Sequence, residues 1–97
     1  MMKNELGRND IAHYAKLLNI TEKQLEMLTD QQFDIIYFLH FHGSITPMNA
    51  FSSLDITKLS TRISEMKQIG IEFDQEYESR KNRYGKTVHY MRYRRAA

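Results

Sequence analysis

The sequence predicts a mainly α-helical domain that ends in a β-hairpin, an α+β class. Up to Gly70, hydrophobic residues recur at the three- and four-residue spacing of amphipathic helices. Beyond Gly70 they alternate with polar residues, which is typical of half-buried strands. Hydrophobic residues form 41% of the 97-residue chain, which is enough for one folded core and argues against disorder.

Two short helices are predicted near the N-terminus. The first covers Asn9–Leu18, with Asp10 or Asn9 as its N-cap. Thr21 and Gln24 have the spacing of a capping box and open the second helix.

A longer helix is predicted after Thr29, which forms another capping box with Gln32. We expect Gly43 to end this helix as a C-terminal cap. The helical pattern places His40 on a face with apolar residues. We therefore expect His40, like His89 in the hairpin, to be half-buried.

The next helix is predicted to begin at Pro47 with Thr46 as its N-cap, because proline loses no hydrogen bond at the first helical position. Its expected apolar side consists of Met48, Ala50, Phe51 and Leu54. A short extended segment, residues 44–46, precedes it. A turn at Asp55-Ile56 follows it, and this turn is so short that the helices on either side must cross steeply.

The helix after this turn is predicted over residues 57–69, with Thr57 as N-cap and Gly70 at its end. Leu59, Ile63 and Met66 recur on one side, which we expect to be buried. The opposite side carries groups able to bond base edges and phosphates. These are Thr57, Lys58, Thr61, Ser64, Glu65 and Gln68, with Arg62 at the margin.

Two strands are predicted on either side of a polar turn at residues 80–85. The expected partners across the hairpin are Phe73 with Met91, Ile71 with Tyr93, Glu72 with Arg92, and Glu78 with Lys86. This register gathers apolar residues on one face and opposite charges on the other. The cations that it leaves without an expected partner are Arg80, Lys81, Arg83, Arg94 and Arg95.

The order helix, extended segment, helix, turn, helix, hairpin is the plan of a winged helix-turn-helix domain. In helix-turn-helix proteins, the helix after the turn lies in the major groove of DNA. Residues 80–97 contain seven Lys and Arg and no acid, and unpaired cations on a projecting hairpin attract phosphates. We expect helix 57–69 and the wing at 80–85 to form one continuous basic surface for double-stranded DNA.

Four segments of the chain stand at fixed spacings: GSITPMNA at 43–50, LDITKLSTRISEM at 54–66, GI at 70–71 and NRYG at 82–85. Together they resemble a family of small winged helix-turn-helix DNA-binding domains that is common in bacteriophage and prophage genomes. The resemblance covers about residues 30–94. It implies DNA binding in the cytoplasm of a bacterial host cell. Asp55 stands where the family usually has glycine, and Lys58 where it usually has arginine.

Other chemistries find little support in the sequence. The absence of cysteine excludes disulfides, Cys-ligated zinc and a Cys nucleophile. The four histidines lack acidic partners at ligand spacing, and the chain has no phosphate-binding glycine loop. We expect no metal, no cofactor and no enzymatic activity. The start of the sequence does not resemble a signal peptide, and the most apolar window, residues 33–41, is too short to cross a bilayer, so we expect no membrane partner.

Two functions remain open at this point. The first is a phage-type DNA-binding protein, either a small transcriptional regulator or an excisionase-like factor. The alternative is a phage-encoded inhibitor that binds a host or defence protein, because the acids of residues 72–78 would repel phosphate. We expect residues 1–28 to form a helical extension that packs on the domain at 29–95 or provides the surface of a homodimer.

Overall fold

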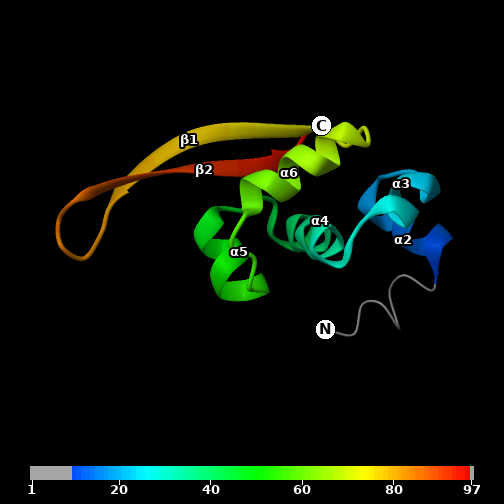
Figure 1. The fold of residues 1–97 in the computed structure, drawn as a ribbon, viewed down its shortest axis with the longest axis horizontal. Coiled ribbons are helices and arrows are strands. Elements are labelled where there is room, and N and C mark those ends of the chain that lie inside the picture. The colour runs from blue at the N-terminus through cyan, green and yellow to red at the C-terminus, as the bar shows by residue number, and fades with distance from the viewer. Residues whose placement is uncertain (1–9, 97) are drawn as a thin grey trace.

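A computed structural model describes residues 10–96 of the chain. Within these residues, five helices form one end of the structure, and a long antiparallel hairpin projects from them (Figure 1). This arrangement confirms the predicted α+β class. In chain order the elements are α2 (Ile11–Leu18), α3 (Glu22–Met27), α4 (Asp30–His42), α5 (Pro47–Leu54), α6 (Leu59–Gln68), β1 (Phe73–Lys81) and β2 (Thr87–Arg95).

The predicted starts of α2, α3, α4 and α5 are confirmed by their capping bonds. The Asp10 side chain accepts a bond from the His13 backbone N–H at the start of α2, while Asn9 lies outside the described residues. Reciprocal capping boxes open α3, α4 and α5. Gly43 ends α4 with a positive φ of 84°, a backbone conformation that favours glycine.

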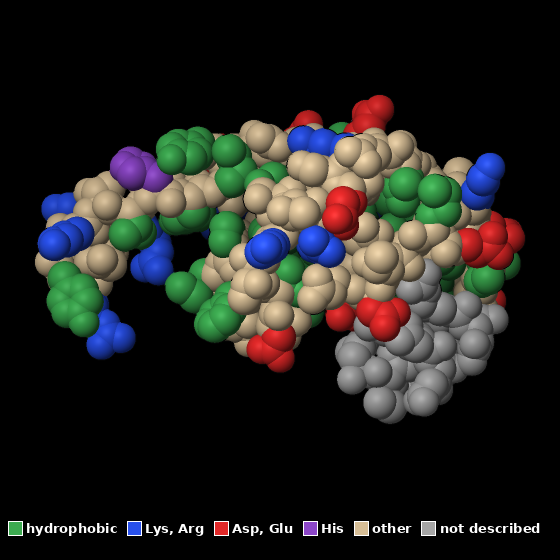
Figure 2. All heavy atoms as spheres, in the orientation of Figure 1, with side chains coloured by type: hydrophobic (Ala, Val, Ile, Leu, Met, Phe, Trp, Pro, Cys, Tyr) green, Lys and Arg blue, Asp and Glu red, His purple; other side chains and the backbone are tan. Residues whose placement is uncertain are grey.

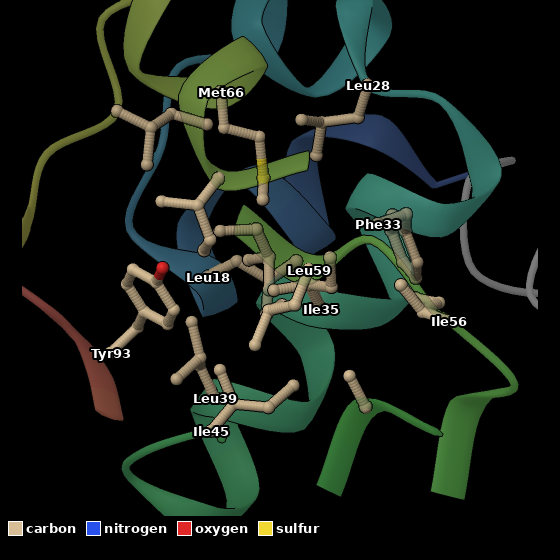
Figure 3. Close-up of a cluster of buried hydrophobic side chains, with 14 of the residues drawn as sticks. Leu18, Leu28, Phe33, Ile35, Leu39, Ile45, Ile56, Leu59, Met66 and Tyr93 are labelled. Carbon is tan, nitrogen blue, oxygen red and sulfur yellow. The ribbon is translucent and has the colours of Figure 1, made fainter. Parts of the chain in front are cut away.

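One hydrophobic core joins the N-terminal helices to the rest of the chain (Figure 3). Leu18 of α2 and Leu28, which follows α3, lie in the same cluster as Phe33 of α4 and Met66 of α6. The predicted inner face of α6 is confirmed, since Leu59, Ile63 and Met66 are each at most 3% exposed. Residues 11–28 therefore pack against the helices that carry the hairpin.

The turn before α6 departs from the predicted cap. Asp55 has a left-handed backbone, and its N–H donates to the carbonyl oxygen of Phe51 at 3.2 Å. Ile56 is 1% exposed and anchors the turn in the core. Because residues up to Lys58 are used in this turn, α6 begins at Leu59, and Lys58 occupies the N-cap position without a side-chain bond. The expectation that Thr57 caps this helix was wrong.

The predicted hairpin register was wrong by four residues. Phe73 pairs with Arg95 instead of Met91, so every expected partner is displaced. The loop explains the shift: Asn82 Oδ1 accepts bonds from two backbone N–H groups, those of Tyr84 and Lys86, and Gly85 has a φ of +78°. This turn is centred later than we expected, which extends β1 to Lys81. A slip of four residues keeps both faces unchanged, so alternation did not reveal it.

The base of the hairpin is attached to the helical end by a third extended segment. Ile45 pairs with Tyr93, and each backbone N–H donates to the other residue's carbonyl oxygen at 2.9 Å. The Tyr93 ring points into the core (Figure 3), where burial raises the pKa of its hydroxyl. The extended segment predicted at residues 44–46 is therefore present, and it fixes the direction in which the hairpin leaves the core.

Several burial predictions were wrong. His40 and His89 are exposed instead of half-buried. On α5, Met48 is 60% and Phe51 is 58% exposed, so only part of its apolar side faces the core. Ala50 faces the core, and Met48, two positions earlier, lies on nearly the opposite side of the helix. Among the described residues, no helix has the length and hydrophobicity needed to span a membrane.

Candidate nucleic-acid interface

The outer face of α6 is accessible, and the N-terminal helices do not cover it. The residues predicted to contact DNA lie on this face of α6 or in the turn that precedes it. Lys58, Thr61, Ser64 and Gln68 are exposed, as is Thr57 in the turn, and Arg62 and Glu65 are half-buried. Short hydroxyls, an amide and two cations thus face away from the core on one helix, which suits contact with base edges and phosphates.

The one carboxylate of this set is held by neighbouring side chains. Glu65 Oε1 accepts a bond from Gln32 Nε2 of α4 at 2.9 Å and lies 3.5 Å from Arg62 Nη1. The Arg62 charge is therefore partly balanced within α6. Lys58, before the first turn, forms no ion pair within residues 10–96 and adds its full charge to this face.

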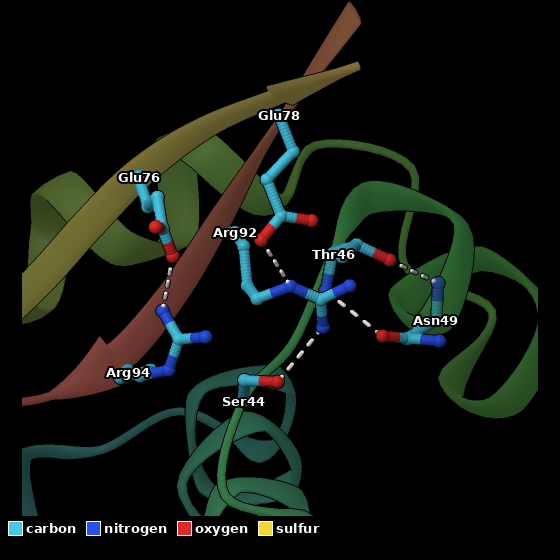
Figure 4. Close-up of polar contacts among 7 residues, drawn as sticks. All are labelled: Ser44, Thr46, Asn49, Glu76, Glu78, Arg92 and Arg94. Atoms are coloured by element: carbon cyan, nitrogen blue, oxygen red, sulfur yellow. Dashed lines mark hydrogen bonds and ion pairs between the residues drawn. The ribbon is translucent and has the colours of Figure 1, made fainter. Parts of the chain in front are cut away.

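Ion pairs neutralise the inner half of the hairpin (Figure 4). Arg92 Nε lies 2.9 Å from Glu78 Oε2, and Arg92 Nη1 donates to Ser44 Oγ at 2.9 Å. The hydrogen bond from Arg92 lowers the pKa of the Glu78 carboxyl and raises the pKa of Arg92 itself. Arg94 Nη1 lies 2.8 Å from Glu76 Oε1, so the expectation that Arg94 lacks a partner was wrong.

Arg95 also has partners, contrary to prediction. Its Nη1 donates to the Leu18 carbonyl oxygen at 2.7 Å, and its Nη2 donates to that of Asn19 at 2.9 Å. Burial lowers the pKa of this guanidinium. Arg95 therefore caps the C-terminal end of α2 and is not available to phosphate. The sequence did not reveal this contact because no local pattern connects residues at opposite ends of the chain.

The tip of the hairpin carries the cations that remain without acidic partners within the described range. Arg80, Lys81 and Arg83 are exposed, as predicted, and the Arg83 guanidinium lies 5.7 Å from the centre of the Tyr84 ring. Lys86 joins them, because the true register places it in the loop and not opposite Glu78. The Asn82 and Gly85 turn pattern was the signal that would have identified Lys86.

The two groups of cations do not form one continuous basic surface. Figure 2 shows Lys and Arg side chains at the hairpin tip and near the start of α6, with hydrophobic side chains of α5 between them. The exposed Met48 and Phe51 belong to α5. A groove of about 590 Å³ separates the N-terminal end of α5 from the hairpin. The structure thus corrects the expected continuous surface to two basic regions that flank an apolar one.

Within the described part of the chain, no group of three or more His, Asp and Glu side chains is arranged to hold a metal ion. The comparisons with known proteins gave one match. A family model described as a winged helix-turn-helix domain matches residues 30–94. No curated protein and no solved structure matches the chain.

Proposed function

The chain belongs to the winged helix-turn-helix domain family, and on this premise we propose that it is a sequence-specific regulator that binds double-stranded DNA. Membership of this family suggests DNA binding and is typical of proteins that are not enzymes. The finer role that we propose is that of a phage-type transcriptional regulator or excisionase-like factor, acting in the cytoplasm of a bacterial host as a homodimer.

The observation that carries this proposal is the exposed polar side of α6. Thr61, Ser64 and Gln68 recur at three- and four-residue spacing and point away from the core, which suits base-edge contacts in the major groove. Lys58, and Arg62 in part, supply charge for the phosphates beside that groove. Glu65 is held by Gln32 and lies at the edge of the contact.

The hairpin tip provides the second contact. Arg80, Lys81, Arg83 and Lys86 are exposed and have no acidic partner among residues 10–96, so they bind backbone phosphates and orient α6 without reading sequence. The ion pairs of Glu76 and Glu78 reduce the repulsion that the acidic strand would otherwise exert on DNA. Arg94 and Arg95 are structural in this proposal and contact no phosphate.

Selection from random duplex DNA, followed by titration of the selected and a scrambled duplex at two salt concentrations, tests the proposal. We expect the selected duplex to bind more tightly and the affinity for both to fall steeply as salt rises. Binding that is absent or insensitive to salt contradicts the proposal. A pull-down from host lysate after nuclease treatment distinguishes DNA binding from the alternative function as an inhibitor of a host or defence protein. A host protein that is retained without nucleic acid would favour the inhibitor.

A further inference from the structure

The groove between the N-terminal end of α5 and the hairpin has a volume of about 590 Å³. Figure 2 shows the hollow that separates the hairpin from the helical end of the molecule. This volume is in the range of pockets that hold small organic molecules. No residue of α6 lines the groove. Recognition of base edges by α6 therefore does not account for it.

Both walls of the groove carry apolar side chains. Met48 lies on the α5 side and is 60% exposed, and Val88 and Tyr90 lie half-buried on the hairpin side. Covering such side chains with an apolar group is favourable, whereas a DNA phosphate would have to lose water against them. The walls therefore suit an occupant with an apolar body better than they suit a DNA strand.

Two hydrogen-bond donors in the groove are held in place by the fold (Figure 4). Asn49 Oδ1 accepts a bond from the Thr46 backbone N–H at 3.0 Å, and this bond orients the side-chain amide. Arg92 is held by Glu78 through Nε and by Ser44 through Nη1. These bonds use neither Asn49 Nδ2 nor Arg92 Nη2. Both side chains line the groove, so each brings a further donor to it in a fixed position.

The groove also has a positive charge. Arg92 is balanced by Glu78, but Arg80 lines the groove from the hairpin without an acidic partner in the described part of the chain. No Asp or Glu is among the lining residues. The opposite wall includes the N-terminal end of α5, where the helix dipole is positive. Donors and positive charge, without a carboxylate, select an anion.

We propose that the α5–hairpin groove binds a small organic anion, in which an oxyanion group is joined to an apolar body. The oxyanion accepts hydrogen bonds from Arg80, Asn49 and Arg92, and the apolar body lies between Met48 and Tyr90. Arg80 is also a proposed phosphate contact, so the anion and DNA compete for its charge. Binding of the anion does not require DNA, and only this competition rests on the proposed function.

Fluorescence titration of the full chain without DNA tests the site, with anilinonaphthalene sulfonate as the probe and phenylnaphthylamine as its neutral counterpart. We expect the sulfonate to bind at least tenfold more tightly than the neutral compound. Arg80→Ala should weaken sulfonate binding about tenfold, because it removes a charged donor. Lys81→Ala is the matched control, since the neighbouring side chain points to the opposite face of β1 and does not line the groove. Equal effects of the two variants overturn the proposal.

A second matched pair tests the apolar wall. Met48 and Phe51 are 60% and 58% exposed on α5, but only Met48 lines this groove. Met48→Ser should therefore weaken sulfonate binding several-fold, whereas Phe51→Ser should leave it unchanged, and neither should lower the melting temperature. If inorganic phosphate binds as tightly as the sulfonate, the apolar wall has no role and the proposal is wrong.

The competition is measured separately, as the affinity for the selected duplex with and without saturating probe at constant ionic strength. We expect the probe to weaken duplex binding by the natural chain. A chain that binds the probe in the groove but binds no duplex contradicts the proposed function and leaves the anion site intact. A chain that binds the duplex but not the probe contradicts the anion site alone, and an unchanged duplex affinity contradicts the competition.

Discussion

Arg95 Nη1 lies 2.7 Å from the carbonyl oxygen of Leu18, although 77 positions separate the two residues in the chain. This bond, with the one to Asn19, connects the last strand to the end of the first described helix. Residues 11–28 are thus held by a polar contact as well as by the shared core.

We predict that Arg95→Ala destabilises the fold by about 2 kcal/mol, because it leaves two carbonyl oxygens at the end of α2 without their charged donor. Urea denaturation measures this loss. Arg94→Ala is the control, since it removes a solvent-exposed ion pair with Glu76 and should cost less than about 1 kcal/mol. Equal losses in the two variants would show that Arg95 has no special role in holding α2.

The left-handed backbone of Asp55, with φ of 58°, makes the turn before α6 sensitive to substitution. Asp55→Ala should lower stability by about 1 kcal/mol, because a Cβ without a compensating side-chain bond is strained in this region. Asp55→Gly should be at least as stable as the natural chain, since glycine adopts this conformation freely. Thermal unfolding of both variants checks the order, and a more stable alanine variant would contradict it.

On the hairpin tip, Arg83→Ala should weaken binding to all duplexes alike and reduce the magnitude of the salt slope by about one. The reason is that a phosphate contact contributes charge and no sequence information. Titrations of a selected and a scrambled duplex at several salt concentrations measure both quantities. Lys23→Ala is the control. It removes an exposed cation of α3, at the opposite end of the molecule from the hairpin tip (Figure 1), and should change neither the affinity nor the salt slope.

On α6, Thr61→Ala should change the preference among duplexes more than the overall affinity, because the Thr61 side chain faces the proposed base edges. A repeat of the selection with this variant shows whether the preferred sequence changes. Ser60→Ala is the control, as Ser60 is exposed on the same helix but lies outside the set of residues that we propose to contact DNA. If Thr61→Ala prefers the same sequence as the natural chain, Thr61 does not contribute to sequence recognition.

The Glu78–Arg92 pair should make stability depend on pH in acid. The bond from Arg92 lowers the pKa of Glu78 below its ordinary value of 4.5, so the contribution is present above that pH and is lost as the pH falls through the lowered value. Urea midpoints of the natural chain and of Glu78→Gln should differ at neutral pH and converge in strong acid. A difference that persists in strong acid would rule out this ion pair as its source.

The elements were predictable because their signals are local. The capping residues of α2 to α5, the proline at the start of α5 and the apolar stripe of α6 act over three or four positions, and the structure places these as expected, whereas the predicted cap at Thr57 was wrong. The hairpin was predictable as a hairpin, but its register was not, because alternation is satisfied equally by any even slip. The hydrogen bonds from the backbone N–H groups of Tyr84 and Lys86 to the Asn82 side chain fix the position of the turn and therefore the register.

Local patterns in the sequence were enough to predict the fold class, the buried side of α6 and the basic character of the last segment, since each depends on composition or on spacing within one element. Which cations of the hairpin have partners among the described residues depends on contacts between distant positions. Arg92, Arg94 and Arg95 have partners 14, 18 and 77 positions away, respectively, at Glu78, Glu76 and Leu18. The pairs of Arg92 and Arg94 are set by the register of the hairpin, and the contact of Arg95 is set by where the base of the hairpin meets α2. No single segment encodes either of these.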